Sequence, residues 1–159
     1  MVVGIVVGIL LSIIAPSLYM AWVPFQAFLS TITSDPLAAL YGVFGANFAG
    51  YNAINQFMNI MSFDVTEFFA PVLLSWIFIG IIAGGIAQGI GRGIAASSIV
   101  MGVVLLLWLL FGVFAGVSIV EPFTTNLMDT LGAIVGAEIG AVIGGLVGGA
   151  ISGPYEEFY

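Results

Sequence analysis

Glu138 is the residue of this sequence that combines reactive chemistry with a position deep inside a hydrophobic run. It lies within LGAIVGAEIGAVIGGLVGGAIS, from Leu131 to Ser152. An ionised carboxylate inside a membrane helix costs roughly 2.5 kcal/mol or more, so such a group is a functional candidate by default. We favour a neutral glutamic acid that hydrogen-bonds a neighbouring helix and fixes its register. A carboxylate in a proton or cation path and a pair with a base on another subunit remain as alternatives.

Partners for Glu138 are expected at its own depth, about 10 Å from the outer end of its helix. Ser75 and Trp76, and also Ser12, are expected near that depth, and hydroxyl and indole N–H groups can donate to a carboxyl oxygen. Arg92 is expected at the opposite surface, which excludes an ion pair within the chain. The sequence therefore predicts an intramembrane proton or hydrogen-bond site made of Glu138, Ser75 and Trp76.

The other polar residues form no catalytic or metal-binding pattern. The chain has no histidine and no cysteine, which removes thiolate chemistry and nearly every zinc or copper site. Asp64 and Glu67 have the spacing of a capping box, with Phe63 and Phe68 as its hydrophobic staple, so we interpret them as a helix start. We predict no catalytic residue, no metal and no cofactor. The chain is not expected to be an enzyme, although it could be an accessory subunit of one.

A glycine-rich stretch, GIGRGIAASS at residues 89–98, superficially resembles a phosphate-binding loop. No strand precedes it and no Gly-Lys-Ser/Thr follows it, as such loops require. Glycines in this number are typical of a tight turn between two helices. We predict a helical hairpin here and no nucleotide site.

The composition is that of a membrane protein. Of the 159 residues, 62% are hydrophobic and 6% are charged, whereas about a quarter of the residues of a soluble domain are charged. One arginine against eight acids gives a formal charge of −7, which argues against a nucleic-acid partner. The acidic, lysine-free composition hints at a prokaryotic source, halophilic or otherwise extremophilic.

Four hydrophobic runs are long enough to cross a hydrocarbon core about 30 Å thick. They predict an all-α integral membrane protein, a single membrane domain over 1–159, with spans at about 1–23, 67–89, 97–120 and 131–152. The first run has no basic segment before it, so we expect a span and not a signal peptide. Proline is expected to bend the first span at Pro16 and to end the third at Glu121-Pro122.

The segment between the first two spans, 24–66, contains no apolar run long enough to cross the membrane, and we expect an interfacial helical segment on the outer side. Residues 24–34 place Phe25, Phe28, Leu29 and Ile32 on one helical face, which is typical of a helix lying in the membrane interface. Asp35-Pro36 is expected to stop that helix. The apolar run 37–50 has the length of a re-entrant or interfacial segment.

Glycines recur at every fourth residue in several spans, which leaves a helix face without side chains. Such a face lets another helix approach to backbone contact in lipid. The predicted helix-packing residues are Gly132, Gly136, Gly140, Gly144, Gly148, Gly80, Gly84, Gly4 and Gly8. On a helical wheel Glu138 points away from the main ladder of the last span, so that span is expected to pack on two faces at once.

These features predict a non-catalytic integral membrane subunit of a larger membrane protein complex, which packs through its glycine-rich faces. The alternative is a self-assembling channel or transporter with Glu138 in a proton or cation path. The partners expected are the lipid bilayer and other integral subunits or further copies of the chain. Because cationic loops stay on the cytoplasmic side, Arg92 predicts a multi-pass protein of the cell membrane with both termini inside.

Overall fold

A computed structural model describes residues 1–49, 51–58 and 70–154, and the regular structure within these ranges is helical throughout. Three helices are long and apolar enough to cross a membrane: α1 (Val2–Tyr19), α6 (Ile90–Phe114) and α8 (Leu127–Ile151). A shorter apolar helix, α5 (Pro71–Ala87), packs against all three. The remaining elements are α2 (Val23–Thr31), α3 (Pro36–Gly45), the 3₁₀ turn η1 (Ala46–Phe48), α4 (Ala53–Met58) and α7 (Glu121–Thr125).

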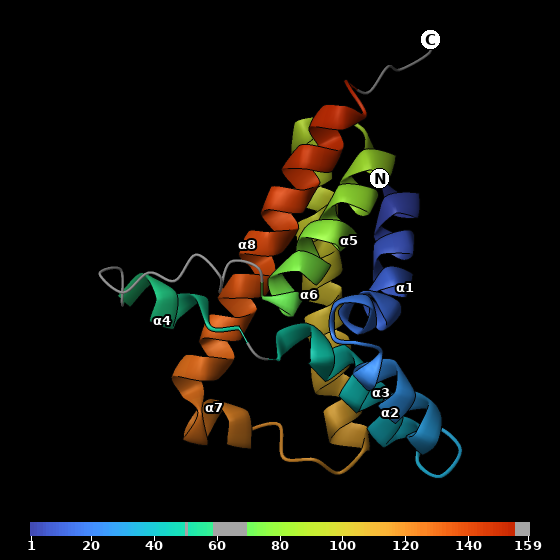
Figure 1. Ribbon diagram of the computed structural model, residues 1–159, viewed down its shortest axis with the longest axis vertical. Helices are drawn as coiled ribbons and strands as arrows, with labels where there is room; N and C mark the ends of the chain where they lie inside the picture. Colours follow the sequence, from blue (N-terminus) through green and yellow to red (C-terminus); the bar gives the residue numbers. More distant parts are fainter. Residues whose placement is uncertain (50, 59–69, 155–159) are drawn as a thin grey trace.

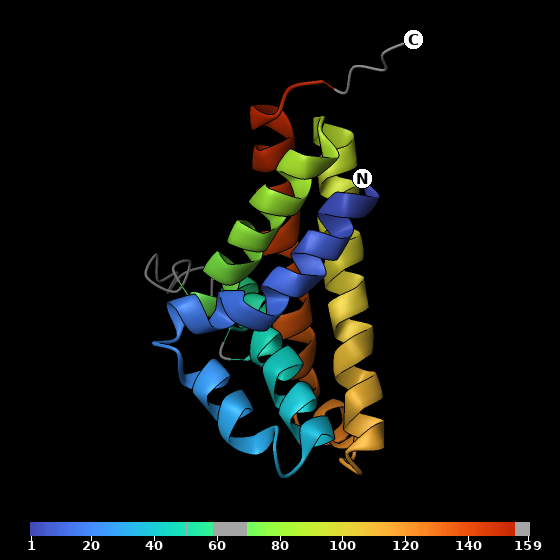
Figure 2. The same cartoon turned by 90° about the vertical axis from the view of Figure 1, so that its right-hand side faces the viewer.

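The bundle has two ends of different construction (Figures 1 and 2). The amino end of α1, the connection between α5 and α6 and the carboxyl end of α8 gather at one end, which we call the hairpin end. Helices α2, α3 and α7 lie at the opposite, loop end. There α3 packs on α6. Helix α4 and η1 pack on α8, and α4 lies about halfway along the bundle in Figure 1. The loop end is therefore built from short helices laid against the long ones.

The turn predicted at residues 89–98 is much shorter in the structure. Only Gln88 and Gly89 separate α5 from α6, and both have positive φ, at 56° and 82°. The Gln88 N–H donates to the carbonyl oxygen of Gly84 at 3.1 Å, which is the last helical bond of α5. The rest of the stretch, including Arg92, belongs to α6. Glycines do not break a helix whose surroundings offer its backbone no alternative hydrogen bonds.

The third predicted span, 97–120, is displaced toward the amino terminus, because α6 ends at Phe114 and not at Glu121-Pro122. Gly116, at φ 71°, ends the helix with a left-handed cap. Its N–H bonds the carbonyl of Val113 at 3.1 Å, and the N–H of Val117 bonds that of Gly112 at 2.9 Å, the pairing of a Schellman motif. Pro122 lies instead in the first turn of α7, where a missing N–H costs nothing.

Three further boundaries differ from those predicted. The first span ends at Tyr19 and not near residue 23, since Ala21 and Trp22 have positive φ. Helix α5 begins at Pro71, four residues after the predicted start of the second span at residue 67. Helix α8 begins at Leu127, about one turn earlier than residue 131. The capping box at Asp64 and its staple lie outside the described residues.

Asp35 was expected to stop a helix, and in the structure it also starts the next one. Its Oδ1 accepts the N–H of Ala38 at 3.0 Å and caps α3, with Pro36 in the first turn. Aspartate is among the preferred residues at this position because its oxygen satisfies a free N–H. The described part of the apolar run 37–50 forms α3, which lies against α6 and α2, and η1, which lies against α5 and α8.

Candidate functional site

The buried side of helix α8 consists of residues that have almost no side chain. Glycine or alanine occupies each of its buried positions, Gly132, Ala133, Gly136, Ala137, Gly140, Ala141, Gly144, Gly145, Gly148 and Gly149. These positions form two adjacent ladders about 100° apart. Two adjacent faces of this helix are therefore in contact with protein.

The first ladder, Gly132 to Gly148 at every fourth residue, packs on α5 in the carboxyl half of α8. A Cβ added to Gly140 would lie 2.8 Å from the Cβ of Trp76, and one added to Gly144 or Gly148 would overlap backbone carbonyl groups of α5. From the other side, a Cβ on Gly80 would lie 2.7 Å from the carbonyl oxygen of Ala141. At each of these positions any side chain would force the two backbones apart.

The second ladder packs on α6. Gly145 lies against Gly93 and Ser97, and Gly149 lies against Gly89, so that an added Cβ would again meet backbone atoms or a hydroxyl. Gly84, from α5, also approaches Gly145, where an added Cβ would lie 2.6 Å from the carbonyl oxygen. Helix α8 is thus held between α5 and α6 through small residues.

The first helix joins the bundle in the same way. A Cβ on Gly4 would lie 2.5 Å from the carbonyl oxygen of Ala83 in α5, and one on Gly8 would lie 2.6 Å from Cγ2 of Val100 in α6. Gly4 and Gly8 therefore contact other helices of this same chain. The sequence does not show which helix packs against a glycine face. In the structure, helices of this same chain pack there.

Glu138 is partly exposed near the middle of α8, and its hydrogen-bond donor is Ser98 of α6. The Ser98 hydroxyl donates to Oε1 at 2.6 Å. The surrounding exposed side chains of the two helices, among them Ile99 and Val135, are apolar. The carboxyl group consequently lies at mid-helix on a surface that otherwise suits lipid.

Ser75 and Trp76, the donors predicted for Glu138, bond elsewhere. Ser75 Oγ donates to the carbonyl of Pro71 at 2.7 Å and lies 3.3 Å from that of Ala15. Trp76 Nε1 donates to the carbonyl of Asn47 at 2.8 Å. The prediction missed Ser98 because it treated residues 89–98 as a surface turn, whereas α6 begins at Ile90 and carries Ser98 two turns into the bundle.

Asn47 is a buried polar contact that the sequence did not reveal. Because Pro16 has no N–H, the carbonyl of Ser12 loses its helical partner, and Asn47 Nδ2 donates to it at 3.0 Å. Asn47 is fully buried, and its Oδ1 has no hydrogen-bond partner in the described structure. The Asn47 side chain thus connects η1 to α1, and the Asn47 backbone carbonyl, which accepts from Trp76 Nε1, connects η1 to α5.

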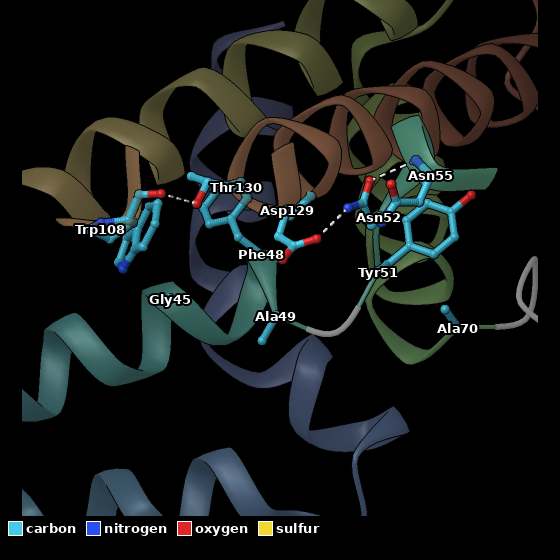
Figure 3. A pocket seen from close by; sticks show the side chains of 12 residues that line it. Gly45, Phe48, Ala49, Tyr51, Asn52, Asn55, Ala70, Trp108, Asp129 and Thr130 are labelled. Atoms are coloured by element: carbon cyan, nitrogen blue, oxygen red, sulfur yellow. Dashed lines mark hydrogen bonds between the residues drawn. The ribbon is translucent and has the colours of Figure 1, made fainter. Parts of the chain in front are cut away.

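A cavity of about 700 Å³ lies at the loop end between η1, α4, α6 and α8. Figure 3 shows Asp129, Asn52 and Asn55 together on one side and Trp108 on the other, with Phe48 between them. The cavity is lined by Gly45, Phe48, Ala49, Tyr51, Asn52, Asn55, Ala70, Trp108, Pro122, Asp129, Thr130 and Ala133. It combines aromatic walls with one carboxylate.

The polar side of this cavity is held by hydrogen bonds across two helices. Asn52 Nδ2 donates to Asp129 Oδ1 at 2.7 Å, and Asn52 Oδ1 accepts the backbone N–H of Asn55 at 3.0 Å. Thr130 Oγ1 donates to the carbonyl of Pro122 at 2.8 Å and joins the starts of α7 and α8. The bond from Asn52 orients the Asp129 carboxylate, which is itself exposed.

A second cavity of about 500 Å³ lies at the hairpin end, where the first turn of α6 meets the end of α8. Within the described residues, no group of three or more histidine, cysteine, aspartate or glutamate side chains is placed to hold a metal ion. Comparisons with protein-family models, with curated proteins and with solved structures found no match to this chain.

Proposed function

We propose that this chain is a non-catalytic integral membrane subunit of a larger complex, and that a partner helix docks on the outer side of α6 and α8 at Ser98 and Glu138. The observation that carries this is the carboxyl group itself, partly exposed at mid-helix among apolar side chains. Polar groups facing lipid are costly, and they normally face protein or a water-filled cavity.

The shape of α6 supports the same face. Gly91, Ala95, Ser98 and Gly102 follow one another along one side of the helix, at spacings that share a face. A Cβ on Gly91 or Gly102 would have no atom of another element within 4 Å. Small residues open on one helix face allow close approach by another helix. The glycines of α8, by contrast, are already covered by this chain.

We further propose that α5 is the fourth span, which gives the four-span architecture. Its 17 residues extend about 26 Å, a little short of the hydrocarbon core. With the hairpin end on the cytoplasmic side, Arg92 and both termini lie inside and the segment 24–66 lies outside. The described helices α2 and α3 then form the interfacial layer on the outer side. This arrangement is supported by the gathering of the helix ends in Figure 1.

Single cysteines test the docking face cleanly, because the chain has no cysteine of its own. We expect Gly102→Cys, labelled with a thiol-reactive photo-cross-linker, to attach covalently to a partner in native membranes. Gly42→Cys in α3 is the matched control, since a Cβ there also meets nothing within 4 Å. Mass spectrometry of the cross-linked band identifies the partner. Equal cross-linking of both variants, or of neither, would refute the proposed face.

A self-assembling channel is the second candidate, favoured by the partial exposure of the Glu138 carboxyl group beside a hydroxyl. In that case the cross-linked partner of Gly102→Cys is a further copy of this chain. Purified protein in vesicles would also carry protons or cations, and Glu138→Gln would abolish that flux because an amide cannot titrate. Flux that survives in Glu138→Gln would remove the ion-path function.

A further inference from the structure

The cavity at the loop end has the size and lining of a small-molecule site. Its volume of about 700 Å³ falls within the range of roughly 300–1,000 Å³ that ligand pockets occupy. Aromatic side chains form much of its wall: Phe48 of η1, Trp108 of α6, and Tyr51, which lies between η1 and α4. We infer that it binds an ammonium group carried on an apolar body.

Asp129 supplies the charge that such a ligand requires. Asn52 directs its Nδ2 at one carboxylate oxygen, at 2.7 Å, and the bond from the N–H of Asn55 to Asn52 Oδ1 fixes which way the amide points. A carboxylate offers about four acceptor positions on its two oxygens, so the Asn52 bond leaves room for a second donor. A positively charged N–H or N-methyl group from the cavity can approach there.

The aromatic wall is held in place by its own packing. The rings of Phe48 and Trp108 have centroids 5.4 Å apart, and Trp108 is stacked on Tyr41 at 6.1 Å. Ring faces attract cations, most strongly for tryptophan, and the attraction grows when the site is desolvated. These contacts hold the rings of Phe48 and Trp108 in fixed orientations in the cavity wall.

Charge at the loop end favours a cation over an anion. Helix α7, which begins at Glu121, and helix α3, which Asp35 caps, lie at the loop end (Figure 1), whereas Arg92 lies in the first turn of α6 at the hairpin end. The summed field of several acids attracts positive ligands and repels negative ones. A phosphate or carboxylate ligand without a compensating ammonium is therefore disfavoured.

Two sources can supply this ammonium chemistry. The cavity lies near the ends of long apolar helices, the level at which lipid headgroups and aromatic belts are found. A choline headgroup of a zwitterionic lipid and a free choline-like amine share the trimethylammonium group that the wall would recognise. The test therefore needs a soluble probe and a lipid probe.

The soluble probe is choline, titrated into the purified full chain in a neutral detergent and compared with its uncharged isostere 3,3-dimethylbutan-1-ol. We expect saturable binding of choline that is about tenfold tighter than binding of the isostere, since only choline carries the charge. Asp129→Asn should weaken choline by about tenfold. Glu121→Gln, which removes an acid outside the cavity lining, should leave choline binding within about twofold.

The lipid probe is native mass spectrometry of the protein from vesicles that contain phosphatidylcholine and phosphatidylglycerol with the same acyl chains. Selective retention of phosphatidylcholine, lost in Asp129→Asn, identifies a lipid headgroup as the ligand. Choline binding without such retention identifies a free amine. Ala49→Leu narrows the cavity from an exposed position and should weaken either ligand without removing a charge. Equal affinity for choline and its isostere, or full affinity in Asp129→Asn, would overturn the inference.

Discussion

The two halves of α8 carry the same glycine repeat but meet different neighbours. In the carboxyl half, Gly144 and Gly148 lie against the backbone of α5. In the amino half, Gly132 lies against the side chain of Asn52 and Gly136 against the ring of Tyr51. One spacing therefore serves a closed helix–helix contact at one end and the edge of an open cavity at the other.

This difference shows what a bare helix face can do. Where it meets another backbone, neither side has a rotatable bond that could yield, so the fit is rigid. Where it meets a polar or aromatic side chain, that side chain can turn aside. The carboxyl half is suited to fixing the bundle, and the amino half is suited to holding groups around a ligand.

The largest effect is expected at the rigid contact. Gly144→Ala should lower the free energy of unfolding in detergent by about 3 kcal/mol, because its Cβ would overlap the Ile77 carbonyl and force two helices apart. Gly102→Ala is the control, since its Cβ has open space, and it should be neutral or stabilising by up to about 1 kcal/mol. Thermal unfolding followed by circular dichroism measures both. Equal stability of the two variants would contradict the rigid contact.

A somewhat smaller loss in the free energy of unfolding is expected at the buried side-chain amide of Asn47. Asn47→Ala should cost about 2 kcal/mol, because it leaves the carbonyl of Ser12 buried without a donor. In a Pro16→Ala background, residue 16 regains the N–H that bonds this carbonyl, so Asn47→Ala should cost less there. A double-mutant cycle measures the coupling. Additive effects would show that the amide does not compensate for the proline.

Gly132→Ala tests the amino half of the same ladder, where the glycines meet side chains that can rotate. Its Cβ would overlap the Asn52 side chain, which can rotate, so the cost should be about 1 kcal/mol and well below that of Gly144→Ala. Rotation of Asn52 would also release Asp129 and weaken choline binding. A loss of stability as large as that of Gly144→Ala would mean that the two halves are equally rigid.

The smallest effect is expected at Ser98. Removing its hydroxyl in Ser98→Ala should change the free energy of unfolding by about 1 kcal/mol or less, since Glu138 is partly exposed and can find another donor. If a partner helix covers this face, the same variant should reduce recovery of that partner more than it reduces stability. Quantitative co-purification from native membranes makes the comparison.

Several expectations from the sequence agree with the structure at a coarse level. The helical class and three long apolar helices follow from hydropathy alone, because lipid leaves a chain few ways to satisfy its backbone. The spacing of the glycines identified which faces of α8 have no side chains. Those faces contact protein along the ladder from Gly132 to Gly148.

The boundaries and the polar contacts were less predictable. Glycines at 89–98 favoured a turn, yet Gly93 is helical because it packs on Gly145. Because α6 starts at Ile90, Ser98 lies within bonding distance of Glu138. Ser75 and Trp76 instead donate to backbone carbonyls. Asn47 gave no local signal, since its role depends on the carbonyl of Ser12, 35 residues away.

The sequence by itself determined that this chain is helical, apolar and able to let helices touch at their backbones, because those properties depend on residue types and their period. Only the tertiary structure decided which helix fills each bare face, which hydroxyl reaches the carboxyl group, and that three aromatic rings and Asp129 surround one cavity. Those outcomes depend on where α5, α6 and α8 stop and how they cross. Residues far apart in the chain set these features together.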